Sequence, residues 1–350
     1  MVRRVAFAVP GDLATPTGGY AYDRRMITEL EHLGWHVDPV NLGDGFPHPS
    51  HEQRKAAQVR LMDLPAGCPI VIDGLAFGVL PEIAMQLRSR YPLLALIHHP
   101  LALETGLSPA QADDFRASER AALAAAKSVV VTSATTARLL VADYDVPADR
   151  IVVACPGSEP APAATGSNDG TVRLLSIGSV VPRKGFDVLI AALATLADLS
   201  WHLTVAGDRS RDPGCAAQLD ADILRREFRD RVAVLGAVSS ERIAKLYAGA
   251  DVFTLASRFE GYGMTFSEAI ARGLPVIATT AGAIPESVPA GAGLLVPPDD
   301  ASALAVALRR IIENPGERHR MSVAAREASR KLPTWQDSAK VFSRALEAMA

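Results

Sequence analysis

Short apolar runs alternate with longer amphipathic stretches along both halves of the chain. The runs are brief, rich in β-branched residues and bounded by Gly or Pro, which is typical of buried strands. In the first half the predicted strands are Val5–Val9, Trp35–Val40, Pro69–Ile72, Leu93–Ile97, Ser128–Thr132 and Ile151–Ala154. In the second half they are Val172–Ile177, Trp201–Ala206, Arg231–Leu235, Asp251–Leu255, Pro275–Ala278 and Leu294–Val296. This alternation predicts mainly parallel sheets with helices on both faces.

The stretches between these runs carry apolar residues at helical spacing. The clearest one extends from Tyr22 to Leu33 and stops at Gly34, a residue suited to the end of a helix. Ser108 and Pro109 open a second helix, over 110–126, as its N-cap and first-turn proline. Further helices are predicted near 185–197, 214–229, 240–249, 264–272, 300–313 and 316–331, with a last one from about 335.

The clearest change of composition lies at Ser158–Gly170, which reads SEPAPAATGSNDG and has no apolar periodicity. Such a segment is typical of a linker. A chain of 350 residues also favours two domains. We therefore expect an α/β protein with two Rossmann-like, doubly wound domains facing a cleft, over residues 1–160 and 161–334. Ligands of such sheets bind outside the carboxyl ends of the strands.

Composition narrows the range of partners. The chain has 36 Lys and Arg against 39 Asp and Glu, a net charge of −3, so no nucleic-acid partner is expected. Its 3 cysteines are widely spaced and lack the spacing of a zinc site, which fits a reducing compartment. We find no signal peptide and no apolar run of membrane-spanning length, and expect a cytoplasmic protein. The segment His51–Arg60 is only mildly basic, and the N-terminal half has no strongly basic amphipathic helix. The sequence therefore neither supports nor excludes association with a membrane.

The most informative segment follows the strand Asp251–Leu255 and enters a helix, reading SRFEGYGMTFSEA from Ser257 to Ala269. Its glycines expose the backbone, and N–H groups at a helix start favour an anion such as a phosphate. Glu260 is placed to accept hydrogen bonds from sugar hydroxyls, and Glu268 from a ribose diol. The alternative is a structural glycine turn with two solvated glutamates. The candidate binding residues of the loop are Gly261, Tyr262, Gly263, Met264 and Thr265.

Glu260 and Glu268, with seven residues between them in EGYGMTFSE, resemble the paired-glutamate motif of the GT-B retaining glycosyltransferases of family 4. The likeness extends from Asp251 to Asp300 and includes Gly282, Pro285-Glu286 and GLLVPPDD. It implies metal-independent transfer of a sugar, with retention, from a nucleotide diphosphate sugar to an acceptor hydroxyl. No cofactor is implied beyond that co-substrate. The donor is expected on the C-terminal domain, and a small-molecule, glycan or lipid acceptor on the N-terminal domain. The resemblance also implies that a helix over 335–350 packs back on the N-terminal domain.

A second part of the resemblance is the loop Gly178–Gly185, which reads GSVVPRKG after the strand Val172–Ile177. The family has an arginine directly after the first glycine and a lysine five residues later. Lys184 fits the lysine, but Ser179 stands where the arginine is expected. Arg183 supplies the missing charge only if the loop turns it inward, and is otherwise a solvated surface arginine. These cations are expected to stabilise a diphosphate leaving group.

The resemblance also covers the N-terminal domain. Gly18 and Gly19 lie in PGDLATPTGGY, before the first helix, and resemble the family's glycine-rich loop. His98, after the strand Leu93–Ile97, matches the family's histidine and is expected to be catalytic together with Lys184 and Glu260. Ordinary structural roles remain the alternative for each of these residues. The further predicted substrate-binding residues are Arg138, Ser179, Arg183, Gly207, Asp208 and Val238.

Other chemistries find less support. Asp143-Tyr144-Asp145 and Asp220-Ala221-Asp222 match a DxD metal motif, but both lie in polar helical stretches, so no metal site is predicted. The absence of GxxxxGK[ST], GxSxG and complete GxGxxG motifs argues against P-loop NTPases, α/β-hydrolases and dinucleotide oxidoreductases. The rival readings are a GT-B phosphorylase, a nucleotide-sugar epimerase, or a catalytically silent nucleotide-sugar-binding subunit. Ser179 in place of arginine motivates the last of these.

Overall fold

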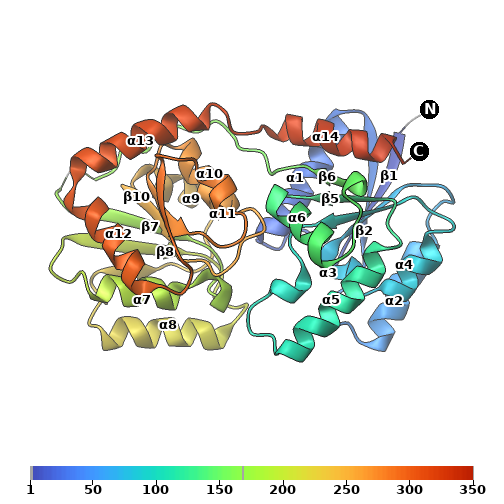
Figure 1. Ribbon diagram of the computed structural model, residues 1–350, viewed down its shortest axis with the longest axis horizontal. Helices are drawn as coiled ribbons and strands as arrows, with labels where there is room; N and C mark the ends of the chain where they lie inside the picture. Colours follow the sequence, from blue (N-terminus) through green and yellow to red (C-terminus); the bar gives the residue numbers. More distant parts are fainter. Residues whose placement is uncertain (1–2, 168, 350) are drawn as a thin grey trace. The chain divides into compact units, whose positions relative to one another are not determined.

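The computed structural model describes residues 3–167 and 169–349 and divides into two units, each built on its own six-stranded parallel sheet (Figure 1). Unit 1 comprises Met1–Gly157 and Pro333–Ala350, and unit 2 comprises Ser158–Leu332. The boundaries predicted from the sequence are at 160 and 334. Among the helices of the described residues, none is long and apolar enough to span a membrane.

The strands of unit 1 are paired in the order β2-β1-β3-β4-β5-β6. Every pairing is parallel, and the central strands are buried because their side chains are apolar on both faces. These strands are β1 (Arg3–Val9), β2 (Trp35–Asn41), β3 (Ile70–Asp73), β4 (Leu93–Ile97), β5 (Ser128–Val131) and β6 (Ile151–Val153). All six predicted strands are therefore present, with ends that differ by at most two residues.

The longer helices of unit 1 begin at capping residues. Thr17, Ser108 and Ser133 each accept a hydrogen bond from a backbone N–H of the first turn. The first helix starts four residues earlier than the apolar spacing predicts, so Gly18 and Gly19 form its first turn rather than a loop before it. The helices are α1 (Gly18–His32), α2 (His51–Met62), α3 (Gly74–Phe77), α4 (Pro81–Leu87), α5 (Pro109–Leu123), α6 (Ala134–Asp143) and α14 (Trp335–Glu347).

The last helix, α14, packs on unit 1 beside α1. Phe342 is fully buried and stacks on Phe7 of β1, with ring centroids 6.3 Å apart. The indole Nε1 of Trp35 donates to Ser343 Oγ at 2.9 Å. Residue 350, the end of the helix predicted over 335–350, lies outside the described residues.

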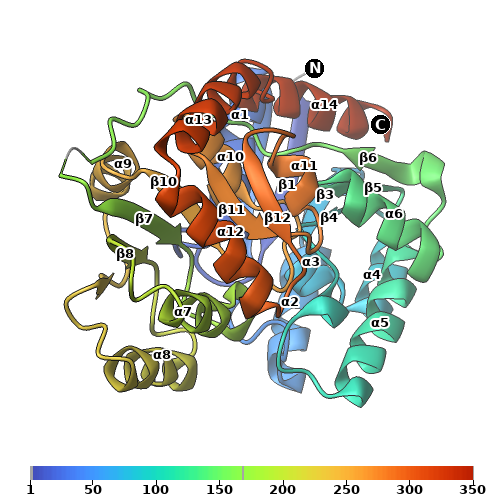
Figure 2. The same ribbon diagram turned by 60° about the vertical axis from the view of Figure 1, so that its left-hand side comes forward.

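Unit 2 repeats the doubly wound arrangement with the strand order β12-β11-β10-β7-β8-β9. Its strands are β7 (Val172–Ile177), β8 (Trp201–Ala206), β9 (Val232–Val234), β10 (Val252–Leu255), β11 (Val276–Thr279) and β12 (Gly293–Val296). Helices α7 and α12 lie side by side, and α10 packs against α13 (Figure 2). The helices are α7 (Phe186–Ala194), α8 (Pro213–Arg225), α9 (Ser240–Ala248), α10 (Met264–Ala271), α11 (Ile284–Ser287), α12 (Ala301–Glu313) and α13 (Pro315–Ser329).

The segment predicted as a linker, Ser158–Gly170, has no helix or strand in its described residues but belongs to unit 2. The backbone N–H of Ala164 donates to Arg272 O at 2.9 Å, and that of Thr165 to Ala248 O at 2.8 Å. Ser167 Oγ donates to Asp251 Oδ2 at 2.7 Å. Residue 168 lies outside the described residues. The segment therefore begins at the boundary between the two units, and composition alone could not show that backbone hydrogen bonds hold it against the rest of unit 2.

Candidate active site

A buried carboxylate paired with two cations lies beyond the carboxyl ends of β7 and β10 in unit 2. Glu260 is only 5% exposed. Lys184 Nζ donates to its Oε1 at 2.6 Å, and Arg183 Nη1 lies 3.2 Å from its Oε2. Ser257 Oγ also donates to Oε1, at 2.6 Å. Because two cations face one carboxylate, the group carries an excess positive charge, which suits an anionic ligand.

Backbone packing brings the two loops together. Lys184 ends a short 3₁₀ turn, Pro182–Lys184, and is followed by Gly185 in the left-handed region at φ +64°. A Cβ on Gly185 would overlap the carbonyl oxygen of Ala256, so only glycine lets the two loops approach this closely. The loop also turns Arg183 inward, so that its guanidinium reaches Glu260 and the carbonyl oxygen of Phe259.

The ion pairs fix the charge state of Glu260. Burial alone would raise the pKa of this carboxyl, but the charges of Lys184 and Arg183 outweigh burial and lower the pKa to about 2. Glu260 is therefore ionised throughout the neutral range.

Arg258 ties the same loops together, and sequence reasoning missed it. Its guanidinium binds Asp187 Oδ2 at 2.7 Å and Asp299 Oδ1 at 2.7 Å, and its backbone N–H donates to Arg183 O at 2.8 Å. Asp187 lies in the first turn of α7. Arg258 thus fixes the loop that carries Arg183 and Lys184. Its only signal in the sequence is its position two residues before Glu260.

The loop after Glu260 leads into α10. Gly263 occupies the N-cap position at φ +87°, and no side chain caps the helix. Uncapped N–H groups at a helix start leave donors for a ligand. Gly261 and Tyr262 are buried, whereas Met264 and Thr265 are half-buried.

The second glutamate of the motif, Glu268, lies inside α10. Tyr247 OH donates to its Oε2 at 2.9 Å, and Arg272 lies over the Tyr247 ring. Burial raises the pKa of Glu268, although the Tyr247 hydrogen bond opposes this. In the structure this carboxylate is separate from the group formed by Glu260, Lys184 and Arg183.

The remaining predicted residues of unit 2 lie at the ends of β7, β8 and β9. A Cβ on Gly207 would overlap the carbonyl oxygen of Gly178, so the turns after β7 and β8 are in close contact. The carboxylate of Asp208 is used within its own turn, where it accepts from Ser210 N and Oγ at 2.8 Å. Ser179 and Val238 are half-buried.

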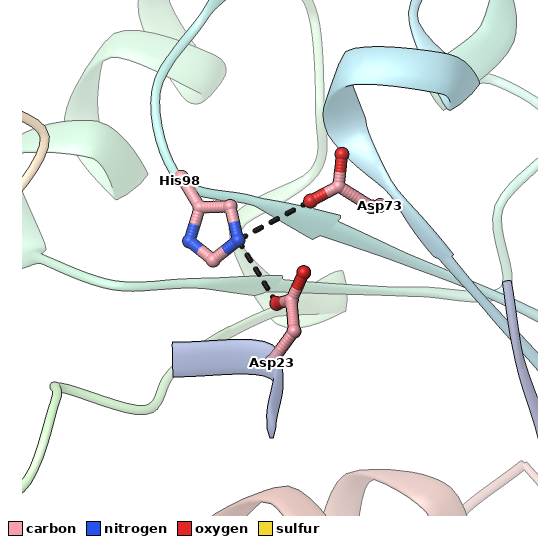
Figure 3. Close-up of side chains that lie close together, drawn as sticks. All are labelled: Asp23, Asp73 and His98. Carbon is pink, nitrogen blue, oxygen red and sulfur yellow. Dashed lines mark hydrogen bonds and ion pairs between the residues drawn. The ribbon is translucent and has the colours of Figure 1, made fainter. Parts of the chain in front are cut away.

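In unit 1, His98 lies between two buried aspartates (Figure 3). Its Nε2 is 3.1 Å from Asp23 Oδ1, on α1, and 3.3 Å from Asp73 Oδ2, at the end of β3. Asp23 is 0% exposed and Asp73 2%. Sequence reasoning found His98 but neither aspartate. Their only signals are a polar residue within the apolar spacing of α1 and a carboxylate directly after a buried strand.

Charge within this cluster favours a protonated histidine. Burial alone would lower the pKa of His98, but Asp23 and Asp73 outweigh burial and raise the pKa to about 10. Burial and the charge of Asp73 raise the pKa of Asp23. The three side chains present ligand atoms within 4.8 Å of one another, which is close enough for a cation. In the metal-free protein Nε2 donates a proton to the carboxylates, so we interpret the cluster as an ion pair; a metal ion would have to displace that proton.

Of the other predicted residues of unit 1, only Gly19 lies against the His98 ring; Gly18 has open space around it, and Arg138 is exposed. Gly19 lies against His98, because a Cβ there would sit 3.2 Å from the ring carbon Cδ2, whereas Gly18 has open space at that position. Arg138 is exposed on α6, and its guanidinium donates to Thr135 Oγ1 at 2.7 Å. His99 is directed to Glu104, at 2.9 Å, rather than to the aspartates.

The DxD-like segments form ordinary surface ion pairs. Asp145 pairs with Arg120, and Asp220 with Arg209. Asp222 pairs with Arg225 at 2.8 Å. A cavity of 670 Å³ between α7 and α12 contains none of the predicted site residues, so we place the candidate chemistry at the loops described above.

The chain is similar to known glycosyltransferases. Residues 157–328 match the family model described as glycosyl transferases group 1. An MMP alpha-(1->4)-mannosyltransferase of Mycolicibacterium hassiacum is 28% identical over 314 residues, which cover 84% of this chain and 74% of that protein. A D-inositol 3-phosphate glycosyltransferase of Xylanimonas cellulosilytica is 33% identical over 238 residues, covering 63% of this chain and 57% of that protein. The chain thus spans a little over half the length of this second relative.

Solved structures agree at the level of the fold. A sucrose-phosphate synthase of Thermosynechococcus elongatus has a TM-score of 0.83 at 24% identity, with 99% of both chains covered. The Anabaena protein HepE, solved with UDP and glucose, has a TM-score of 0.77 at 18% identity, covering 99% of this chain and 100% of that one. Residues 157–328, which make up most of unit 2, are thus similar to the glycosyl transferases group 1 family, and the chain has the GT-B fold of the solved glycosyltransferases.

Proposed function

We propose that this protein transfers a sugar from a nucleotide diphosphate sugar to an acceptor hydroxyl, with retention at the anomeric carbon and without a divalent cation. The observation that carries the proposal is the group formed by Lys184, Arg183 and Glu260. It lies beside the uncapped start of α10, at the carboxyl edge of the sheet, where ligands of such sheets bind.

The excess charge of this group suits a diphosphate leaving group. As the bond to the sugar breaks, negative charge develops on the diphosphate, and fixed cations and helix N–H groups stabilise that charge. Lys184 and Arg183 are 14% and 17% exposed, so they act in a poorly solvated site where such interactions are strong. These two side chains take the role that a metal ion has in other glycosyltransferases.

The two glutamates have separate tasks in this proposal. Glu260 accepts hydrogen bonds from the hydroxyls of the transferred sugar, because its low pKa keeps it an acceptor. Glu268 accepts from the ribose of the nucleotide. The leaving phosphate takes the proton of the acceptor hydroxyl, so the reaction needs no protein nucleophile.

The relatives suggest which donors to test. Their names include a mannosyltransferase, a D-inositol 3-phosphate glycosyltransferase and a GDP-mannose-dependent mannosyltransferase. We therefore propose a hexose donor carried on GDP or UDP, and a small-molecule, glycan or lipid hydroxyl as acceptor.

The silent-subunit alternative depends on the missing arginine at Ser179. Arg183 reaches Glu260 from the other end of the same loop, so a second cation is still available to the diphosphate. This geometry favours turnover. A phosphorylase and an epimerase differ from a transferase in their products and are separated by the same assay.

The test is a donor panel of GDP-mannose, UDP-glucose and ADP-glucose, incubated with the full chain in EDTA and followed by NMR. The expected result is release of nucleoside diphosphate from at least one donor, with retained configuration in the sugar product. Binding without turnover supports the silent subunit. Turnover that requires orthophosphate indicates a phosphorylase, and an epimerised donor indicates an epimerase. A requirement for a divalent cation contradicts the proposed metal independence.

A further inference from the structure

We propose that Asp23, together with Asp73, is a positioning residue that holds His98 as a protonated hydrogen-bond donor, so that a substrate oxygen meets the Nδ1–H of His98. The inference concerns unit 1 and rests on the proposed function for the identity of the substrate. It assigns His98 the role of a cationic donor and excludes it as a general base.

The positions of the two carboxylates show which ring nitrogen of His98 carries a proton. The carboxylates of Asp23 and Asp73 both contact the same ring nitrogen of His98, Nε2, although they lie on different elements of unit 1. Whichever of the two carboxylates is ionised can only accept a hydrogen bond, so Nε2 donates its proton to it. Asp73 is itself fixed, because its Oδ1 accepts from Leu75 N at 2.8 Å at the start of α3. Asp23 is buried on α1, one turn after the Gly18-Gly19 pair.

The other ring nitrogen of His98, Nδ1, is open to a ligand. In Figure 3, Nδ1 lies on the side of the ring away from both aspartates. Among the described residues, none provides a hydrogen-bond partner for Nδ1. The His98 side chain is also partly accessible, at 19% exposed. A ligand oxygen can therefore reach this edge of the ring. Gly19 leaves little free space beside the ring carbon Cδ2, which restricts the ring from tilting toward α1.

The groups around the ring of His98 determine its charge state. The titratable groups that face the ring from the described residues are Asp23 and Tyr22 on α1 and Asp73 at the end of β3. The phenol of Tyr22 meets the ring edge-on at 5.4 Å and donates its own proton to Ala154 O, so it supplies no charge. Two carboxylates thus face one imidazole, and the cation is the favoured form. An imidazolium donates through both nitrogens and has no lone pair to accept a proton.

The substrate group that this edge recognises is an oxygen that accepts a hydrogen bond, such as a sugar hydroxyl or a phosphate oxygen. A charged donor also favours an anionic oxygen over a neutral one. Because an aspartate beside a histidine commonly sets its tautomer and orientation, loss of Asp23 is expected to affect function through His98.

The direct test is NMR of the histidine side chains in the full chain without substrate, using His98→Gln to assign the signal. We expect His98 to remain doubly protonated from pH 6 to 8.5 in the wild type. In Asp23→Asn it should titrate within that range, since one opposing charge is worth about 1–3 pH units. Glu29→Gln is the matched control, because Glu29 is a 3% exposed carboxylate on the same helix that pairs with Arg25 instead.

Two results would overturn the inference. One is a wild-type His98 that titrates near the ordinary histidine value of about 6.5, a measurement that needs no variant. The other is an unchanged protonation state in a folded Asp23→Asn protein.

Activity gives a second readout. Donor turnover by Asp23→Asn should fall at least about tenfold between pH 6 and 8.5, as its imidazole loses the proton, whereas wild-type turnover should not show this decline. Asp23→Glu should restore the wild-type profile at least in part. Parallel pH profiles for the wild type and Asp23→Asn contradict the inference. If the NMR result holds but no donor is turned over by the wild type, the proposed function fails and the positioning role of Asp23 stands.

Discussion

At the scale of single residues, the charge of Glu260 is compensated by Lys184 and Arg183 in the absence of substrate. Glu260 is surrounded by Lys184 and Arg183 and has its pKa lowered to about 2. Removing one member of a buried ion pair leaves the partner charge uncompensated, which costs more than the pair itself contributes. A bound diphosphate would supply that missing negative charge.

Glu260→Gln should therefore destabilise the ligand-free protein by about 3–5 kcal/mol at pH 7, and GDP or UDP should offset part of the loss. Because the folded-state pKa is depressed, the stabilisation by Glu260 is complete above the ordinary carboxyl value of about 4.5. It is lost as the pH falls toward about 2, at about 1.4 kcal/mol for each pH unit. Urea unfolding at pH 7, 5 and 3.5 measures this gap.

The control for that experiment is Glu313→Gln, which removes an exposed carboxylate paired with Arg309 and should cost less than about 1 kcal/mol. A stability gap between the wild type and Glu260→Gln that stays constant down to pH 3.5 would refute the assigned charge state.

At this scale a motif can point to residues that the fold brings together, but it cannot show the direction of a side chain. Lys184 and Glu260 are 76 residues apart, and the resemblance named both. Arg258 and Asp23 were missed. One is an arginine in a loop and the other a polar residue in a helix, and the partners of both are distant in the sequence, so no local pattern indicates them. The inward direction of Arg183 is likewise a property of the loop geometry.

At the scale of elements, all 12 strands of the structure coincide with predicted apolar runs, since buried parallel strands leave a strong and local signal. Helices α2, α3, α4, α6 and α11 are not among the predicted helix ranges. Helices α3, α4 and α11 are four, seven and four residues long, too short for a repeat of apolar spacing to be visible, and α2 and α6 each bury only two side chains. The contact between the loops after β7 and β10 was also hidden, because it depends on the backbone of Gly185 and Ala256.

Gly185→Ala tests that contact. The left-handed backbone alone costs about 1–2 kcal/mol, and the overlap with the Ala256 carbonyl adds about 1–3 kcal/mol. Donor turnover should fall at least about tenfold as Lys184 is displaced. Gly236→Ala is the matched control, since Gly236 has a similar backbone at φ +70° and open space around the new Cβ. Equal losses of stability and turnover in the two variants would show that the contact has no special role.

At the scale of the whole molecule, the chain forms two units with separate hydrophobic cores, and its last helix returns to the first unit. Chain length and composition predicted two domains, but composition could not show that Ser158–Gly170 is hydrogen-bonded to unit 2. In the proposed function, unit 2 binds the diphosphate, and the His98 cluster lies in unit 1.

Phe342→Ala should separate the two units experimentally. Phe342 is fully buried against Phe7, so the truncation should cost unit 1 about 3–5 kcal/mol in urea unfolding. Titration with GDP or UDP below the unfolding transition should give an unchanged affinity, because the nucleotide site is assigned to unit 2. Lys340→Ala, at an exposed position of the same helix, is the control. A matching loss of nucleotide affinity would contradict the assignment.

The most direct measurement of the central claim is the rate of donor hydrolysis by the wild type, Lys184→Ala and Lys245→Ala, in EDTA and with the fold checked by circular dichroism. Lys184 is paired with Glu260, whereas Lys245 is an exposed lysine on α9 of the same unit. The account predicts a rate at least about 100-fold lower for Lys184→Ala, since a fixed donor to the developing charge is lost, and a wild-type rate for Lys245→Ala. A folded Lys184→Ala protein that hydrolyses the donor at a near-normal rate would contradict it.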